Sequence, residues 1–184
     1  MHTESDLRRQ IQALQEELEG LRLTLDVVGT MDLDAGILNR NGILDALERG
    51  QRWLSRRGDI YGVLVVAFPA LVAEAVHGNE STEFRTHVAA TIAAAVRDVD
   101  SVGRVDERTF AAVLADLNPG AIEIVAARLR ELLDRMAAST PAMGGAFKIG
   151  GLEILEAKPS GEVLDTALEL ARTSTGTTSL GQIT

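Results

Sequence analysis

The segment from Arg97 to Phe110 constrains the fold more than any other part of this sequence. It reads R-D-V-D-S-V-G-R-V-D-E-R-T-F and follows a stretch from Ser81 to Arg97 whose apolar residues recur with helical spacing. Two runs rich in apolar and β-branched residues, Ser101–Val105 and Thr109–Ala115, flank a polar turn. This pattern is typical of a β-hairpin, so the sequence predicts a helix that leads directly into two antiparallel strands.

Helices and strands alternate along the rest of the chain. We expect a helix over Asn39–Arg56, a strand over Tyr61–Phe68, a helix after Asn118–Pro119, a strand over Ala146–Ile154 and a helix over Glu162–Ala171. This order favours an α+β fold, an antiparallel sheet with flanking helices. Residues 173–184 are rich in Ser, Thr and Gly, and we expect a flexible tail there.

The first 29 residues carry an unbroken apolar stripe. Its members alternate at steps of four and three: Leu7, Ile11, Leu14, Leu18, Leu21, Leu25 and Val28. A strict 3.5-residue repeat is typical of a coiled coil, and Glu17 can pair with Arg22 across a parallel dimer. We therefore expect residues 1–29 to form a coiled-coil helix that makes a homodimer. The alternative is an amphipathic helix that packs on its own globular domain.

Several segments together resemble the GGDEF family of diguanylate cyclases. Five residues fall in register with the family's helix that ends in R-x-x-D and the following hairpin, whose turn is G-G-D/E-E-F: Arg97, Asp100, Gly103, Arg104 and Phe110. Residues 32–40 resemble the family's D-x-L-T-G-L-x-N-R segment. The resemblance covers about residues 30–172 and implies one domain with the nucleotidyl cyclase palm fold.

The catalytic positions of this pattern are altered. The turn reads D-E-R-T-F, so Asp106 and Glu107 replace the two glycines, while Arg108 and Thr109 replace the two acids. Ala67 stands where the family has a metal-binding Asp. Nucleotidyl transfer needs carboxylates that hold Mg²⁺ against a triphosphate. The resemblance therefore implies a degenerate domain that is not an enzyme, with no catalytic residue, metal site or cofactor.

One ligand site of the family has a counterpart here. The resemblance implies that Arg97 and Asp100 bind cyclic di-GMP at an inhibitory-type site, which Arg128 on the following helix would complete. The alternative is that Arg97 and Asp100 form an ordinary surface pair at a helix end. A second R-x-x-D, from Arg56 to Asp59, occurs at a position with no family meaning.

Composition limits the functional class. The 184 residues carry a formal net charge of −9, which argues against nucleic acid or an anionic membrane as the main partner. Cysteine is absent, no apolar run is long enough to span a bilayer, and the N-terminus lacks the features of a signal peptide, so we expect a cytoplasmic protein.

The favoured hypothesis is a regulatory module that binds cyclic di-GMP and signals to a protein partner. The alternative is a scaffold or dimerisation protein that needs no nucleotide. The sequence does not identify the protein partner.

Overall fold

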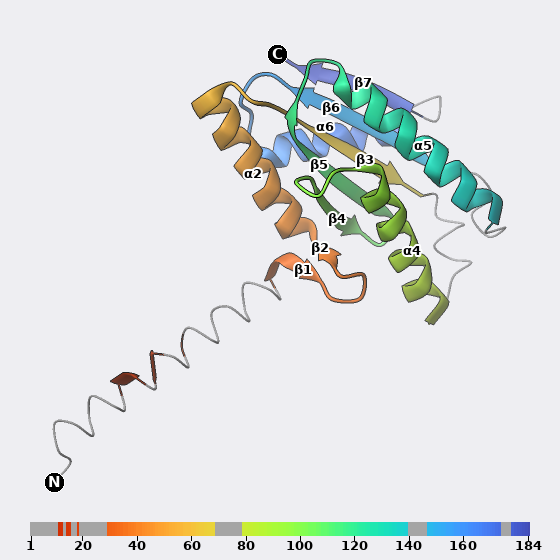
Figure 1. Ribbon diagram of the computed structural model, residues 1–184, viewed down its shortest axis with the longest axis horizontal. Coiled ribbons are helices and arrows are strands. Elements are labelled where there is room, and N and C mark those ends of the chain that lie inside the picture. The colour runs from red at the N-terminus through yellow and green to blue at the C-terminus, as the bar shows by residue number, and fades with distance from the viewer. Residues whose placement is uncertain are drawn as a thin grey trace, which may run out of the picture.

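The structure is a computed structural model and is built around one mixed β-sheet (Figure 1). It describes residues 11–12, 14–15, 18, 29–68, 79–139, 147–173 and 178–184. The strands of the described part are β1 (Met31–Asp32), β2 (Ile37–Leu38), β3 (Ile60–Ala67), β4 (Ser101–Asp106), β5 (Thr109–Leu117), β6 (Lys148–Ile154) and β7 (Thr178–Ile183). They lie in the order β1-β2-β4-β5-β3-β6-β7.

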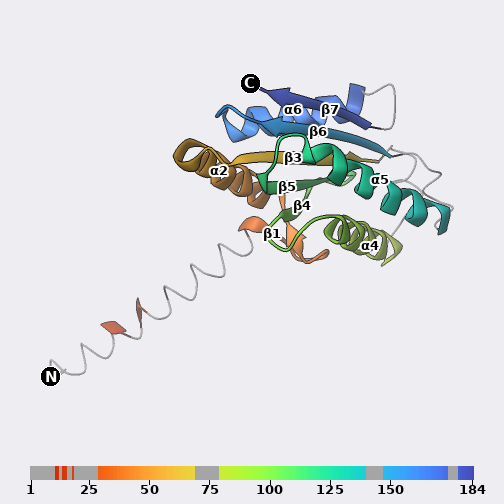
Figure 2. The same cartoon turned by 45° about the horizontal axis from the view of Figure 1, so that its top comes forward.

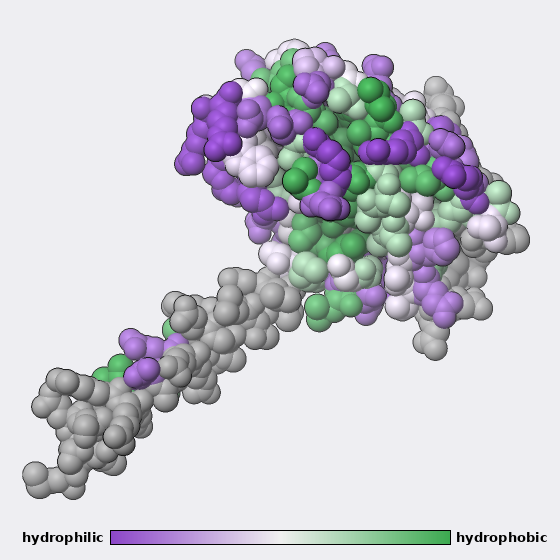
Figure 3. Space-filling view, in the orientation of Figure 1, coloured by the Kyte–Doolittle hydropathy of each residue, from purple (hydrophilic) through white to green (hydrophobic). Residues whose placement is uncertain are grey.

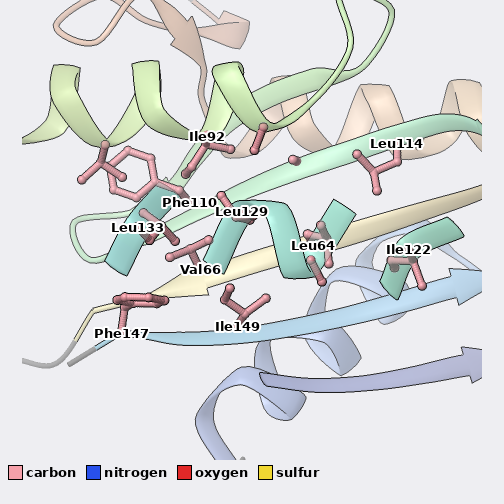
Figure 4. Close-up of a cluster of buried hydrophobic side chains, with 14 of the residues drawn as sticks. Leu64, Val66, Ile92, Phe110, Leu114, Ile122, Leu129, Leu133, Phe147 and Ile149 are labelled. Carbon is pink, nitrogen blue, oxygen red and sulfur yellow. The ribbon is translucent and has the colours of Figure 1, made fainter. Parts of the chain in front are cut away.

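Four helices of the described part cover the two faces of this sheet, and each face has its own apolar core. The helices are α2 (Arg40–Arg57), α4 (Asn79–Ala95), α5 (Ala121–Ser139) and α6 (Ser160–Thr173). Helices α4 and α5 pack on one face, where their side chains surround Leu64, Phe110 and Ile149 (Figure 4). Helices α2 and α6 pack on the opposite face against Val63 and Val65. Figure 2 shows α4 and α5 in front of the sheet and α6 behind it.

The main helices and strands follow from local sequence signals. The side chain of Asn39 caps α2 by accepting a hydrogen bond from the backbone N–H of Gly42 at 3.1 Å. Gly58 ends α2 in the left-handed conformation, with φ of 77°. Ile122, Leu129 and Met136 recur with helical spacing on α5, and all three are buried. These signals place the predicted α+β elements correctly.

The sheet is antiparallel at its centre and parallel near its edges. Strands β4, β5, β3 and β6 are successive antiparallel neighbours. Strand β2 runs parallel to β4, and β7 runs parallel to β6. The prediction of an antiparallel sheet therefore holds for the four central strands. Helix α2 lies between β2 and β3, and α6 lies between β6 and β7. Helical crossovers of this kind join strands that run in the same direction, which accounts for the parallel edges.

The C-terminal segment is a strand, so the prediction of a flexible tail is wrong for Thr178–Ile183. Strand β7 pairs with β6 from Ile149 to Ile154. The carboxylate of Glu153, which is fully buried, accepts hydrogen bonds from the Gly120 backbone N–H and from Gln182 Nε2, both at 2.8 Å. Pairing with β6 and the packing of the partly buried Leu180 and Ile183 against the two cores outweigh the polar composition of the segment.

Several hydrogen bonds hold the start of the domain together. The side-chain amide of Asn39 donates to the carbonyl oxygen of Gly29 at 3.0 Å and to that of Met31 at 3.3 Å. The Asn39 backbone N–H donates to the Thr30 carbonyl at 2.8 Å, and Asn41 Nδ2 donates to the Gly29 carbonyl at 3.2 Å. The helical residues Gly29 and Thr30 are therefore fastened to the first turn of α2.

Only part of the predicted coiled-coil helix lies within the described residues. Ile11, Leu14 and Leu18 are helical, and their side chains are 52–57% exposed. The other members of the apolar stripe lie outside the described part. No helix in that part is long and apolar enough to cross a membrane.

Candidate functional site

The three positions where the resemblance places metal-binding acids lie side by side. Ala67 on β3 pairs with Thr109 on β5, and the Phe68 backbone N–H donates to the Arg108 carbonyl at 2.9 Å. The site thus presents a methyl group, a guanidinium and a buried hydroxyl. Among the residues that the structure describes, no group of three His, Cys, Asp or Glu side chains is arranged to hold a metal ion.

The hairpin turn closes without glycine. Asp106 Oδ1 accepts a hydrogen bond from the Arg108 backbone N–H at 2.9 Å, which is the geometry of an Asx turn. No residue of the turn has a positive φ. Asp106 can therefore replace a glycine at this position with no backbone strain.

A cavity of about 380 Å³ lies beside this turn, and its cations are already paired. Arg104 forms an ion pair with the buried carboxylate of Asp32, and Arg40 lies 3.6 Å from Asp165. Asp106 and Glu107 also line the cavity and are acidic. The cavity therefore presents three carboxylates beside its two guanidinium groups.

Arg97 and Asp100 form a clasp between the end of α4 and the middle of the sheet. Asp100 Oδ2 accepts from the Arg97 backbone N–H at 2.8 Å, and Oδ1 accepts from Arg97 Nη2 at 3.3 Å and from the Ala115 backbone N–H at 3.0 Å. Arg97 Nη2 also donates to the Ala115 carbonyl. The Asp100 side chain is only 2% exposed, so the pair is more than a surface ion pair, although the Arg97 side chain is half exposed.

Arg128 lies on the helix that packs beside α4, on the same face of the sheet. Helices α4 and α5 share one apolar core, and the Thr91 hydroxyl of α4 donates to the Met136 sulfur of α5 at 3.3 Å. Arg128 is exposed, and it makes no hydrogen bond or ion pair with a described residue. The structure thus brings Arg97 and Asp100 into contact and leaves Arg128 as a separate cation on the same face.

Two polar contacts of this region were not foreseen from the sequence. Arg104 pairs with Asp32 across 72 positions of the chain. Asp100 holds Ala115, which is 15 positions away. The only available signal for the first pair is that both residues fall in segments that resemble the family. The second contact is to a backbone N–H, which every residue except proline has, so the amino-acid sequence gives no signal for it.

Comparisons with known proteins place the chain by fold. No protein-family model and no curated protein matches the sequence. Among solved structures, the coiled coil and GGDEF domain of DgcB from Caulobacter crescentus, in complex with c-di-GMP, matches 95% of this chain and 99% of its own, with 19% identity and a TM-score of 0.71. The diguanylate cyclase SiaD from Pseudomonas aeruginosa, in complex with its activator SiaC, matches 97% of this chain and 71% of its own, with 18% identity and a TM-score of 0.70.

A third solved structure agrees with these two. The GGDEF domain of FimX from Pseudomonas aeruginosa matches 83% of this chain and 99% of its own, with 15% identity and a TM-score of 0.66. At these identities the likeness concerns the backbone. It confirms the fold that the resemblance implied.

Proposed function

We propose that this chain is a catalytically inactive GGDEF-like module that binds cyclic di-GMP through Arg97, Asp100 and Arg128 and signals to a protein partner in the cytoplasm. The observation that carries the proposal is the Arg97–Asp100 clasp. A buried carboxylate holds a half-exposed guanidinium in one orientation at the surface. The fold likeness to DgcB, which was solved in complex with c-di-GMP, supports the choice of ligand.

The chemistry of the clasp suits a guanine base or a phosphate. Arg97 Nε and Nη2 are turned toward Asp100, and Nη1 has no partner among the described residues. A guanidinium edge donates well to guanine O6 and N7 and to phosphate oxygens. The Asp100 oxygens already accept hydrogen bonds from their own chain, so Asp100 acts mainly by positioning Arg97. Arg128 would supply a second cation on the same face.

The test is calorimetric titration of the full chain with cyclic di-GMP. We expect Arg97→Ala to weaken binding more than tenfold, or about 1.5–3 kcal/mol, because a charge-assisted contact is lost. Arg128→Ala should also weaken binding. Arg135→Ala is the matched control, since Arg135 is another exposed arginine of α5, and it should leave the affinity unchanged. Absence of binding, or binding that Arg97→Ala does not alter, would contradict the proposal.

The proposed inactivity has its own test. Ala67, Arg108 and Thr109 supply no carboxylate, so the chain should form no cyclic di-GMP from GTP and Mg²⁺. Chromatographic assay of the product against a sample without protein checks this. Product formation that disappears when the 106–109 turn is altered would show that the turn is catalytic.

One observation favours a second candidate, a scaffold that needs no nucleotide. Both carboxylate oxygens of Asp100 are satisfied by groups of the same chain, as in a structural clasp. In that case the fold and an N-terminal coiled coil would mediate assembly alone. The titration above separates the two candidates, because a scaffold would release no heat with cyclic di-GMP.

A further inference from the structure

A second surface hollow lies on the opposite face of the sheet from Arg97. It has a volume of about 640 Å³ and lies between the C-terminal half of α2 and the start of α6. Helices α2 and α6 share one apolar core, while α4 and α5 belong to the other. A ligand in this hollow would therefore be separated from the Arg97 clasp by the thickness of the sheet.

The floor of the hollow is the N-terminus of α6, a helix of 14 residues. The backbone N–H groups of Ser160, Gly161 and Glu162 precede the first internal hydrogen bond, which Val163 donates to the Pro159 carbonyl at 3.1 Å. These three groups have no acceptor among the described residues, and the helix dipole adds partial positive charge at this end.

A buried hydroxyl points to a ligand at the same place. Ser160 lines the hollow, is only 8% exposed, and its Oγ has no hydrogen-bond partner in the described part of the chain. A buried hydroxyl without a partner costs free energy. The oxygen itself is covered, so it would donate to an acceptor in the hollow after the Ser160 side chain rotates toward it. Gly161 leaves the approach open, since a Cβ at that position would meet nothing within 4 Å.

The wall formed by α2 supplies positive charge. Arg52 and Arg56 line the hollow one helical turn apart. Glu48 also lines it, 4.0 Å from Arg52, and both side chains of that pair are 57% exposed, so the attraction is weak. Arg56 makes no ion pair with a described residue. The charged lining residues thus carry one net positive charge in a protein whose total is −9.

We propose that this hollow binds a phosphoryl dianion, with the α6 N–H groups and Ser160 Oγ donating from the floor and Arg56 and Arg52 donating from the wall. Helix N-termini and forked guanidinium groups both favour phosphate oxygens. The volume exceeds what a bare phosphate fills. The structure therefore favours a small phosphomonoester, with its phosphoryl group on the α6 N-terminus, over the free ion.

The test is an NMR titration of the ¹⁵N-labelled full chain at constant ionic strength. Inorganic phosphate and glycerol 3-phosphate are the two probes. We expect saturable shifts of the Ser160, Gly161 and Glu162 amides, and tighter binding of the ester. Arg56→Ala should weaken binding of either probe by about tenfold, and Ser160→Ala by about threefold. Ser160→Ala removes an oxygen with no partner, so the variant should fold normally.

Matched variants keep the test specific. Arg57 is also an exposed arginine of α2 but does not line the hollow, so Arg57→Ala should change the affinity by less than about twofold. Arg97→Ala should leave the affinity at the hollow unchanged, which separates this site from the proposed cyclic di-GMP site.

If the three amides do not shift at about 50 mM of either probe, the proposal is overturned. Equal weakening by Arg56→Ala and Arg57→Ala would also overturn it, since that result would show only non-specific charge attraction. If phosphate binds more tightly than the ester, the preference for a phosphomonoester is wrong.

Discussion

Individual buried polar groups differ in how well this fold satisfies them. Asp100 and Glu153 each accept hydrogen bonds from at least two segments of the chain. The Tyr61 hydroxyl has no partner among the described residues although the residue is only 1% exposed. Burial raises the pKa of Tyr61 to about 12, because the charged phenolate loses its hydration there.

Tyr61 gives a prediction with a defined pH window. In the unfolded chain the phenol ionises near its usual pKa of about 10, while the folded form holds the proton up to a pKa of about 12. The resulting stabilisation of the fold is complete below pH about 10 and is lost as the pH rises to about 12, a change of roughly 2–3 kcal/mol. Tyr61→Phe should remove this part of the pH dependence and leave stability at neutral pH unchanged or slightly higher.

Two measurements check this prediction. Urea unfolding of both proteins between about pH 8 and about pH 12 gives the difference in stability over this window. Tyr61 is also the single tyrosine of the chain, so the tyrosinate absorbance of the folded protein reports its ionisation alone. Ionisation near pH 10 while the protein remains folded would contradict the assignment.

The residue pairs of the site were predictable only when their members are close in sequence. The R-x-x-D spacing predicted the contact between Arg97 and Asp100, which a helix end brings together. The contact of Asp100 with Ala115 depends on how the loop after α4 meets β5. The pair of Arg104 and Asp32 depends on the sheet order that places β1 and β2 beside β4. The spacing of residues along the chain therefore could not predict either contact.

Among the secondary-structure elements, long periodic ones were predictable and short polar ones were not. Helices α2 and α5 have apolar faces with helical spacing, and α2 also has clear capping residues, so both helices were found from the sequence. Strands β1 and β2 are two residues each, too short for any alternation to be seen. Strand β7 reads T-S-L-G-Q-I, and its position is set by pairing with β6.

The attachment of β7 can be tested through one hydrogen bond. Gln182→Ala removes the donor to Glu153 Oε2 and leaves part of a buried carboxylate without a partner. We expect the free energy of unfolding to fall by about 1–3 kcal/mol in urea titrations. Thr184→Ala, just beyond the strand, is the control and should change stability by less than about 0.5 kcal/mol. Equal stability of the two variants would mean that this hydrogen bond does not hold β7.

On the scale of the whole molecule, the surface over α2 is hydrophilic, whereas the described N-terminal residues expose apolar side chains. Hydrophilic side chains cover the outer surface of α2 (Figure 3). Ile11, Leu14 and Leu18 are apolar and more than half exposed. Such residues on one helical stripe are typical of an interface with a second copy of the chain.

We therefore predict that the full chain dimerises through this stripe. Replacing both Leu14 and Leu21 with Glu should convert a dimer into a monomer, because it buries like charges at the seam of a coiled coil. Light scattering coupled to size-exclusion chromatography measures the mass. Gln15→Glu is the control, since Gln15 is exposed beside the stripe, and it should remain dimeric. A monomeric parent chain would refute the prediction, and a dimeric double variant would assign the interface to the globular domain.

The hydrogen bonds that join Gly29 and Thr30 to Asn39 and Asn41 have a geometric consequence for such a dimer. They hold Gly29 and Thr30 in a fixed orientation relative to the first turn of α2. With a continuous helix before Gly29, one inserted residue would turn each domain by about 100° around the helix axis, whereas seven residues would turn it by only about 20°. The number of residues in the helix would thus set the angle through which each domain is rotated about the axis of the dimer.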